Sequence, residues 1–270
     1  MNRYDLLIID PQNDFMDLPG AALPVPGATA DMDRLARWLQ QEAEAVQSVT
    51  VTLDSHPSLA VERTPFWLDE QGAEVPAFTV IRAAHVRAGR WRPRHAACLA
   101  EVLVYLDALE SQGRHQLIVW PVHCVLGTWG HNLHAGLAAS LADWELRTGR
   151  WCHKVLKGQH PLTEQYSAFR AEVPRADDPC SQNNEQLMHR LSDGAPWLLV
   201  AGEALSHCVA ASLDDMMAQL PADRLARTVL LVDCMSPVAG FEEAGTALLD
   251  RARGRGVRVA RLDELTDLAA

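Results

Sequence analysis

Short apolar runs alternate with longer amphipathic segments along most of the chain. Each apolar run has the length of a buried strand, and each amphipathic segment repeats its apolar residues at helical spacing. Strands are predicted at residues 4–10, 46–54, 115–120, 153–157, 196–202, 228–233 and 257–262. Helices are predicted between them, at residues 30–45, 95–112, 131–143, 183–192, 207–219 and 241–253. This alternation predicts an α/β fold whose mostly parallel central sheet is covered by helices on both faces.

One long stretch, residues 57–94, interrupts the alternation and shows no clear period. It is rich in proline, arginine and aromatic residues, and we expect an insertion beside the functional site, either a lid or a subunit contact. Its aromatic residues favour a packed segment over a disordered one: Phe66, Trp67, Phe78 and Trp91. No linker-like or low-complexity segment divides the chain, so we expect one domain spanning residues 1–270 rather than two small ones.

The composition is that of a soluble globular protein, with 48% hydrophobic and 22% charged residues. The formal net charge of -11 argues against a nucleic-acid partner, which needs clustered lysine and arginine, and favours a small-molecule substrate. No apolar run reaches the roughly 18 residues of a membrane span, and no signal segment precedes the first predicted strand. We therefore expect a cytoplasmic protein without a membrane partner.

Polar residues stand at the carboxyl ends of several predicted strands, where ligands bind in open parallel sheets. Each could be a turn or capping residue by itself, but together they indicate a site. They are Asp10, Asp54, Ser55, His56, His123, Lys157 and, shortly after the strand at 196–202, Cys208.

Cys208, Lys157 and Asp10 offer the parts that cysteine chemistry needs. A thiol attacks only as thiolate, and its ordinary pKa of about 8.5 leaves it mostly protonated near pH 7. The start of a helix at Cys208 supplies partial positive charge and free N–H donors, Lys157 adds a full charge, and Asp10 can accept the proton. The alternative is that Cys208, in a chain of six cysteines without a CxxC pair, is a small buried apolar residue.

Asp54, His56 and His123 offer one carboxylate and two imidazoles. Residues two apart in a strand face the same side, so an Asp-x-His at a strand end can direct both side chains toward one ion. Three oxygen and nitrogen ligands without sulfur suit a divalent metal with open coordination positions, such as zinc, iron or manganese. The alternative is that these residues are capping or buried polar residues.

Several stretches resemble the isochorismatase-like cysteine hydrolases, and among them the nicotinamidases, in the order of that family. They are LLIIDPQNDFMDLPGAALPVPGA, VTLDSHP, VWPVHCVLGTWG, VLKGQHPLTEQYSAF, VAGEALSHCVAASLDD and LLVDCMSPV. The resemblance implies a three-layer, Rossmann-like fold and a catalytic triad of Asp10, Lys157 and Cys208. It also implies an oxyanion hole formed by the backbone N–H groups of Ala204 and Cys208, with a cis peptide bond between Glu203 and Ala204.

The resemblance further implies a divalent metal ion, zinc first with iron or manganese as alternatives, held by Asp54, His56 and His123. It implies assembly into a homo-oligomer as well. An aromatic slot suits a flat ring, although large aromatic residues are as often part of a core. The candidate substrate-binding residues are Phe15, Trp67 and Tyr166.

The tripeptide HCV occurs twice, at 123–125 and 207–209, so the choice of nucleophile needs an argument. Cys208 is followed by helix formers, whereas Cys124 is followed by VLGTWG, whose glycines suit a loop. Cys208 is therefore the expected nucleophile, and Cys124 is expected to be a buried neighbour.

Some positions depart from the nicotinamidase pattern: Glu203, Leu205, Ser206 and His207 replace the residues usual just before the nucleophile. His207 could tune the thiol, donate to a substrate or face a partner subunit. Glu62 could be a further metal ligand, but an exposed loop glutamate is the favoured interpretation. These departures predict a pocket that differs from that of the family.

The predicted activity is hydrolysis of a small carboxamide such as nicotinamide, through a thioester, to the acid and ammonia. Asp10 accepts the thiol proton and returns it to the leaving ammonia, and water positioned or activated by the metal then hydrolyses the thioester. The alternatives are another small amide or carbamoyl substrate, or a non-catalytic binding protein on the same fold. Hydrolysis of an isochorismate-type vinyl ether is disfavoured, because the members of the superfamily that do this lack the cysteine.

Overall fold

A six-stranded, all-parallel sheet forms the centre of the computed structural model, which describes residues 3–269. The strand order is β10-β9-β8-β1-β2-β7. The strands are β1 (Tyr4–Ile9), β2 (Val46–Asp54), β7 (His153–Lys157), β8 (Trp197–Gly202), β9 (Thr228–Leu231) and β10 (Arg258–Ala260). All residues of β1 are buried, since β1 lies between β8 and β2 and helices cover both faces.

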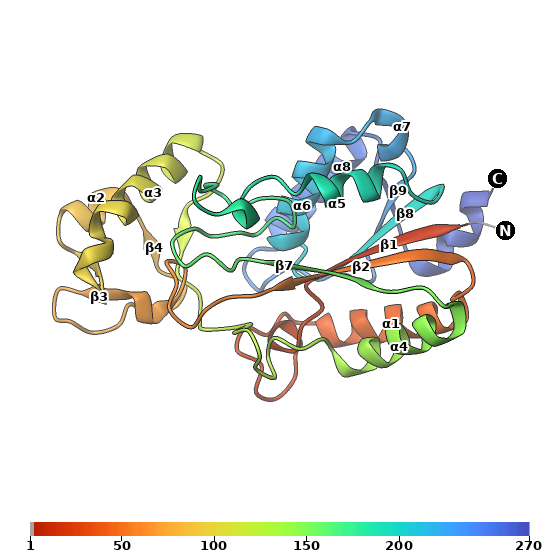
Figure 1. Ribbon diagram of the computed structural model, residues 1–270, viewed down its shortest axis with the longest axis horizontal. Helices are drawn as coiled ribbons and strands as arrows, with labels where there is room; N and C mark the ends of the chain where they lie inside the picture. Colours follow the sequence, from red (N-terminus) through yellow and green to blue (C-terminus); the bar gives the residue numbers. More distant parts are fainter. Residues whose placement is uncertain (1–2, 270) are drawn as a thin grey trace.

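Helices lie on both faces of this sheet, so the molecule has the three layers that the sequence predicts (Figure 1). One face is covered by α1 (Ala28–Gln41) and α4 (Ala135–Thr148). The other is covered by α5 (Glu185–Ser192), α6 (Cys208–Gln219) and α8 (Glu242–Gly254), with the short α7 (Ala222–Leu225) before β9. Short 3-10 helices occupy Asn13–Phe15, Thr64–Phe66, Ala96–Cys98, Pro179–Ser181 and Leu262–Ala269.

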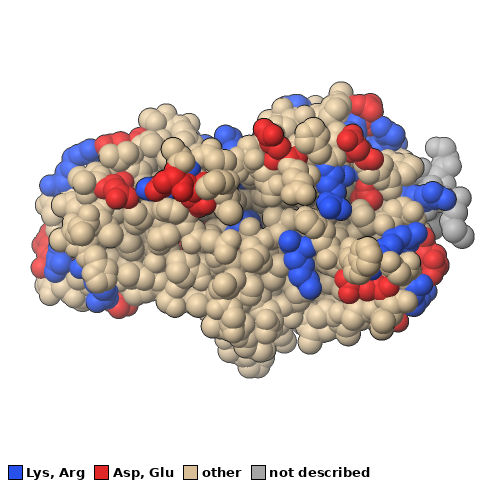
Figure 2. Space-filling model, viewed as in Figure 1, with Lys and Arg blue, Asp and Glu red and all other residues tan. Residues whose placement is uncertain are grey.

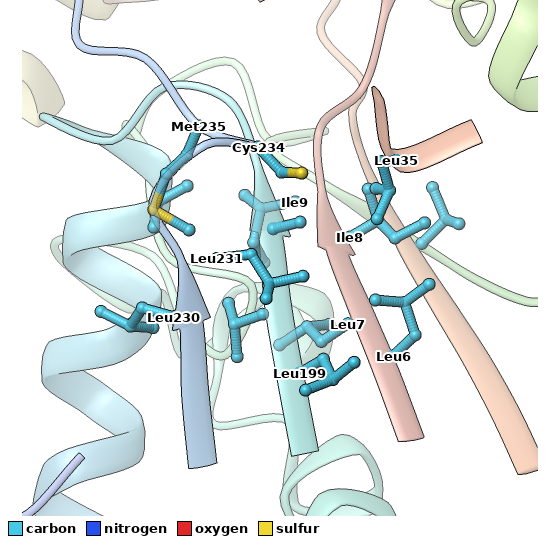
Figure 3. Close-up of a cluster of buried hydrophobic side chains, with 14 of the residues drawn as sticks. Leu6, Leu7, Ile8, Ile9, Leu35, Leu199, Leu230, Leu231, Cys234 and Met235 are labelled. Atoms are coloured by element: carbon cyan, nitrogen blue, oxygen red, sulfur yellow. The ribbon is translucent and has the colours of Figure 1, made fainter. Parts of the chain in front are cut away.

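The main hydrophobic core is built from the aliphatic side chains of the central strands. Figure 3 shows residues of β1, β8 and β9 packed together with Leu35 of α1, and with Cys234 and Met235 of the segment after β9. Leu7, Ile8 and Leu230 have no exposed surface. Burial of such side chains is the dominant stabilising contribution in folding, so the sheet is a rigid base for the residues at its edge.

A second, smaller core lies at one end of the molecule and is formed by residues 57–119 (Figure 1). Its elements are β3 (Trp67–Asp69), β4 (Val80–Ile81), α2 (Ala83–Arg87), β5 (Trp91–Pro93), α3 (Leu99–Gln112) and β6 (Leu117–Ile118). Phe66 and Trp67 are buried in this core together with Leu106 and Leu109 of α3. We call residues 57–119 the second lobe.

The second lobe corrects two sequence-based assignments. The strand predicted at 115–120 is reduced to β6, which pairs with β4 in an antiparallel manner and lies outside the central sheet. The helix predicted at 95–112 is present as α3, but it packs on the stretch 57–94. The apolar period shows that a segment is buried, yet it does not identify the partner that buries it.

The visible surface carries acidic and basic side chains interspersed with one another, without a large area of one sign (Figure 2). No helix within residues 3–269 is both long and apolar enough to cross a membrane.

Candidate active site

Four neighbouring strands end at one edge of the sheet, and each leads into a polar residue. β1 is followed by Asp10, β2 ends at Asp54, β7 ends at Lys157, and β8 leads through a short turn to Cys208, the first residue of α6. In the parallel register Asp54 is the partner of Lys157. The strand order thus brings together residues that lie far apart in the sequence, at the edge where open parallel sheets bind ligands.

Lys157 is buried and lies between two carboxylates. Its Nζ is 2.9 Å from Asp10 Oδ2 and 2.8 Å from Asp54 Oδ1, and it also donates to the carbonyl oxygen of Gln165 at 3.1 Å. Burial by itself lowers the pKa of Lys157, but the two carboxylates outweigh it and hold that pKa well above its usual value. The side chain is therefore an ammonium, and its Nζ lies 3.6 Å from the sulfur of Cys208.

Asp10 is fully buried and has a φ of 42°, which is uncommon for a residue with a side chain. The hydroxyl of Thr52 donates to Asp10 Oδ1 at 2.5 Å and accepts from the Asp10 N–H at 3.0 Å. Burial raises the pKa of Asp10 although Lys157 and Thr52 oppose this shift. A carboxylate with a raised pKa accepts a proton more readily than an ordinary aspartate.

Cys208 is buried at the start of α6, and its sulfur contacts both charged partners of the predicted triad, Lys157 and Asp10. Burial raises the pKa of the Cys208 thiol well above its usual value, and Asp10 adds to this effect, whereas the Lys157 ammonium opposes it. The sequence suggests that the helix start and the lysine ionise the thiol, but desolvation outweighs them here. The resting sulfur is therefore a thiol that needs a base.

Asp54, His56 and His123 are buried, and their ligand atoms lie within 4.8 Å of one another. His56 Nε2 is 2.8 Å and His123 Nε2 is 3.4 Å from Asp54 Oδ2. Burial and Arg63 lower the pKa of His56, but Asp54 and Glu62 outweigh them and raise it to about 9. For His123 burial and Arg63 prevail and lower the pKa to about 4.

Glu62 and Arg63, from the base of the second lobe, complete this cluster. Glu62 is buried rather than exposed as predicted, and its Oε1 is 3.1 Å from His56 Nδ1. Arg63 has no exposed surface, and its guanidinium lies 3.2 Å from Glu62 and 3.1 Å from His123 Nε2. Nothing in their sequence context separates them from loop residues, because only the folded lobe places them against the histidines.

A small cavity separates the thiol from the histidines. Its apolar and aromatic walls come from Phe15, Leu23, Trp120, Tyr166, His207 and Val238. Of the three predicted substrate-binding residues, Phe15 and Tyr166 line the cavity. Trp67 does not, since it is fully buried in the second lobe and donates to the carbonyl oxygen of Val61 at 2.6 Å.

Trp120 and Glu164 also line the cavity, and sequence reasoning missed both. Trp120 Nε1 donates to the Tyr166 hydroxyl at 3.0 Å, which fixes two aromatic walls relative to each other. Burial raises the pKa of Glu164 to about 8, so this carboxyl is mostly neutral at pH 7. Both residues stand within stretches that resemble the nicotinamidases, and that position is the signal that could have found them.

His207 lines the cavity next to Cys208 and packs on Trp120 and Phe241, with ring centroids 5.1 Å and 4.7 Å away. Ser206 Oγ accepts from the Val238 N–H at 3.0 Å and lies 2.9 Å from His207 Nδ1. The hydroxyl hydrogen is then directed to Nδ1, and we assign the ring proton to Nε2. Burial lowers the pKa of His207 to about 4, so the ring is a neutral N–H donor at pH 7.

The turn between β8 and α6 depends on Gly202. This glycine has a φ of 118°, and a Cβ atom there would lie 2.0 Å from the carbonyl oxygen of Ile9 on β1. One residue further on, the peptide bond between Glu203 and Ala204 is cis, as the family resemblance implies. The N–H groups at the start of α6 have no partner within the helix, as in any helix, and Ala204 and Cys208 both line the cavity.

The chain is similar to nicotinamidases over nearly its whole length, although no protein-family model matches it. The nicotinamidase of Saccharomyces cerevisiae is 23% identical over 256 residues, which are 94% of this chain and 97% of the yeast protein. Its solved structure covers 95% of this chain and 99% of its own at 20% identity, with a TM-score of 0.63. A structure of the yeast enzyme bound to the inhibitor nicotinaldehyde has a TM-score of 0.64, 19% identity, and covers 96% of this chain and 99% of its own.

Two further solved structures share the architecture. The pyrazinamidase of Pyrococcus horikoshii in complex with zinc is 19% identical, covers 96% of this chain and 99% of its own, and has a TM-score of 0.53. An isochorismatase family protein from Desulfovibrio vulgaris is 20% identical, covers 100% and 99%, and has a TM-score of 0.55. The chain therefore has the isochorismatase-like hydrolase fold. Its sequence is similar to that of the yeast nicotinamidase at low identity, and the predicted fold is confirmed.

Proposed function

We propose that the protein is a cysteine amidohydrolase that converts a small carboxamide, nicotinamide or a close analogue, to the acid and ammonia. The observation that carries this proposal is the arrangement of charged groups around the Cys208 sulfur. Lys157 lies 2.9 Å from Asp10 and 3.6 Å from the Cys208 sulfur. An acid-base group, a cation and a thiol in mutual contact are the parts that cysteine catalysis requires.

In the first half of the reaction, Cys208 transfers its proton to Asp10 while the sulfur attacks the amide carbon. The new C–S bond converts the carbonyl oxygen to an oxyanion, which accepts hydrogen bonds from the N–H groups of Ala204 and Cys208. Asp10 then delivers the proton to the amide nitrogen, the C–N bond breaks, and ammonia leaves. The product bound to the enzyme is a thioester.

In the second half, a water molecule gives one proton to Asp10 and adds to the thioester carbon. The C–S bond breaks, the acid is released, and Asp10 returns the proton to the sulfur of Cys208. Lys157 remains protonated throughout and stabilises the negative charge that passes between carboxylate and sulfur. The raised pKa values of Asp10 and Cys208 suit this exchange, because burial disfavours both the carboxylate and the thiolate, so that the proton can pass between them.

We propose that Asp54, His56 and His123 hold a divalent metal ion, zinc first with iron or manganese as alternatives. The donor set fits, since the three ligand atoms converge and Glu62 lies at His56 Nδ1, which directs the His56 Nε2 lone pair toward the common centre. When bound, such an ion supplies Lewis acidity and lowers the pKa of a coordinated water. The zinc in the Pyrococcus pyrazinamidase supports this assignment.

The cavity supports a flat, small substrate. Phe15, Trp120 and Tyr166 offer aromatic surfaces, and His207 offers a neutral N–H donor to a polar atom of the ring. The binding of nicotinaldehyde by the yeast enzyme is consistent with this choice. A different small amide or carbamoyl compound is the second candidate, and His207, which lines the cavity at a position that departs from the nicotinamidase pattern, is the feature that favours it.

The test is ammonia release from a panel of primary amides that includes nicotinamide, pyrazinamide, benzamide and carbamoyl compounds. Cys208→Ala removes the nucleophile, and we expect its kcat to fall at least about 1000-fold. Cys124→Ala is the matched control, because Cys124 is the central residue of the other HCV tripeptide and is fully buried, and it should keep activity. Equal activity of the wild type and Cys208→Ala would show that the nucleophile is wrongly assigned.

A further inference from the structure

Glu203 is a fully buried glutamate that the proposed reaction does not use. It stands between Gly202, the last residue of β8, and Ala204. Its backbone N–H donates to the carbonyl oxygen of Ile9 on β1 at 2.8 Å. Its side chain Oε2 accepts the backbone N–H of Ser236 at 3.0 Å. The residue is therefore connected to β1 through its backbone and to the segment after β9 through its side chain.

The bond from Glu203 to Ser236 belongs to a series that joins residues 202–206 to the segment 234–238. The other members are Gly202 N–H to Cys234 O at 2.9 Å, Leu205 N–H to Ser236 O at 2.9 Å, and Val238 N–H to Ser206 Oγ at 3.0 Å. Three of these four bonds use a backbone acceptor or a short serine side chain. The acceptor of the remaining bond is the Glu203 carboxyl. Through this bond the side chain of Glu203, the residue directly before Ala204, is held against Ser236.

A second carboxyl, that of Asp31 on α1, contacts the same serine. Ser236 Oγ donates to Asp31 Oδ2 at 2.5 Å, and Arg34 contacts Asp31 Oδ1 at 3.2 Å. Burial, followed by the charge of Asp31, holds the pKa of Glu203 well above its usual value. Glu203 is therefore a neutral acid, since Asp31 is the carboxyl with a cationic partner. A glutamine reproduces the size and the acceptor of such an acid.

We propose that Glu203 is a positioning residue whose bond to Ser236 holds the backbone N–H of Ala204 in the direction of the substrate's carbonyl oxygen. The inference rests on the proposed amide hydrolysis. Ala204 is held from both sides, by the Glu203 side chain before it and the Leu205 N–H after it, and both bonds end on Ser236. Because Ser236 is anchored to α1 through Asp31, the donor is fixed before substrate binds.

The experiment compares Glu203→Gln with Glu203→Met, which has a similar length but lacks the acceptor. We expect Glu203→Met to lower kcat about 10- to 100-fold with KM changed less than about twofold, as for a misplaced oxyanion donor. Glu203→Gln should keep kcat within about threefold. Nicotinaldehyde, which can form a tetrahedral adduct with the thiol, should bind Glu203→Met weaker by the same factor as kcat. Nicotinate, which forms no such adduct, should bind equally well.

If the wild type releases ammonia from an amide and Glu203→Met has the same kcat, this inference is overturned while the proposed function stands. A wild type without activity on any amide overturns both. If Glu203→Met does not fold, Glu203→Ala replaces it. Loss of folding in both variants, or equal weakening of nicotinaldehyde and nicotinate binding, shows a purely structural role and overturns the inference.

Discussion

Lys157 connects the thiol to the histidine cluster, because its ammonium contacts Asp10 on one side and Asp54 on the other. The side chain has no exposed surface, so water screens these charges very little. Taking a charged group out of water is costly, and the cost is offset only while opposite charges remain paired. In the proposed reaction the same residue supports the chemistry of Cys208, and its two ion pairs stabilise the sheet edge.

We expect Lys157→Met to abolish amide hydrolysis and to lower the free energy of unfolding by about 3–5 kcal/mol, because two buried carboxylates lose their cation. Urea denaturation followed by fluorescence measures the second effect. Lys154→Met is the control, since Lys154 is exposed on the same strand and should change stability by less than about 0.5 kcal/mol. A Lys157→Met protein as stable as the control variant would refute the role assigned to this ion pair.

At the level of elements, the turn after β8 is determined by how closely β8 approaches β1. Ile9 and Gly202 are partners in the parallel register, and the backbone of Ile9 occupies the position where a side chain at residue 202 would lie. Only a residue without Cβ fits this position at a φ of 118°. The geometry of the segment that leads to Cys208 therefore depends on this glycine.

Gly202→Ala should be severely destabilised, by more than about 4 kcal/mol, because the backbone contact and the positive φ act together. Gly256→Ala is the matched control: Gly256 also has a positive φ, but no atom lies within 4 Å of the added Cβ. We expect it to cost about 1–2 kcal/mol. Thermal unfolding of the two variants measures the difference, and similar melting temperatures would contradict the proposed strand contact.

Elements with a clear period were predictable from the sequence. The strands at 46–54 and 153–157 have the predicted bounds, because local apolar patterns reflect burial in any sheet. β3, β4 and α2 were not predicted, since the stretch 57–94 has no period. The strand predicted at 115–120 was assigned to the wrong sheet, because its partner is chosen by the folded second lobe.

At the level of the whole molecule, burial of titratable groups makes stability depend on pH. Glu172 Oε2 lies 3.3 Å from His115 Nε2, but burial lowers the pKa of His115 to about 4, so this neutral ring does not compensate a carboxylate. Burial raises the pKa of Glu172 to about 7, although Arg114 opposes the shift. The unfolded chain, with an ordinary pKa near 4.5, releases this proton first.

The stability that Glu172 contributes is therefore complete below about pH 4.5 and is lost as the pH rises through about 7. We expect the free energy of unfolding of the wild type to fall by about 3 kcal/mol relative to Glu172→Gln over this range. Urea denaturation at a series of pH values measures this difference. Glu243→Gln, at an exposed position of α8, is the control, and its free energy of unfolding should change with pH as that of the wild type does. If the free energy of unfolding of the wild type changed with pH in the same way as that of Glu172→Gln, the raised pKa of Glu172 would be refuted.

The amino-acid sequence by itself determined the α/β alternation and the chemical groups that follow the strands, since both are local properties. Asp10, Asp54, Lys157 and Cys208 were identifiable because parallel strands end at a common edge. Only the tertiary structure decided that Trp120 lines the cavity while Trp67 does not, and that Glu62 and Arg63 are buried against the histidines.

The direction of each pKa shift was likewise decided by the tertiary structure. Burial raises the pKa of the Cys208 thiol although a lysine lies beside it, because removal from water outweighs the nearby charge. Desolvation and charge pairing depend on distances between residues that are remote in the chain. Such distances exist only once the sheet and the second lobe have folded.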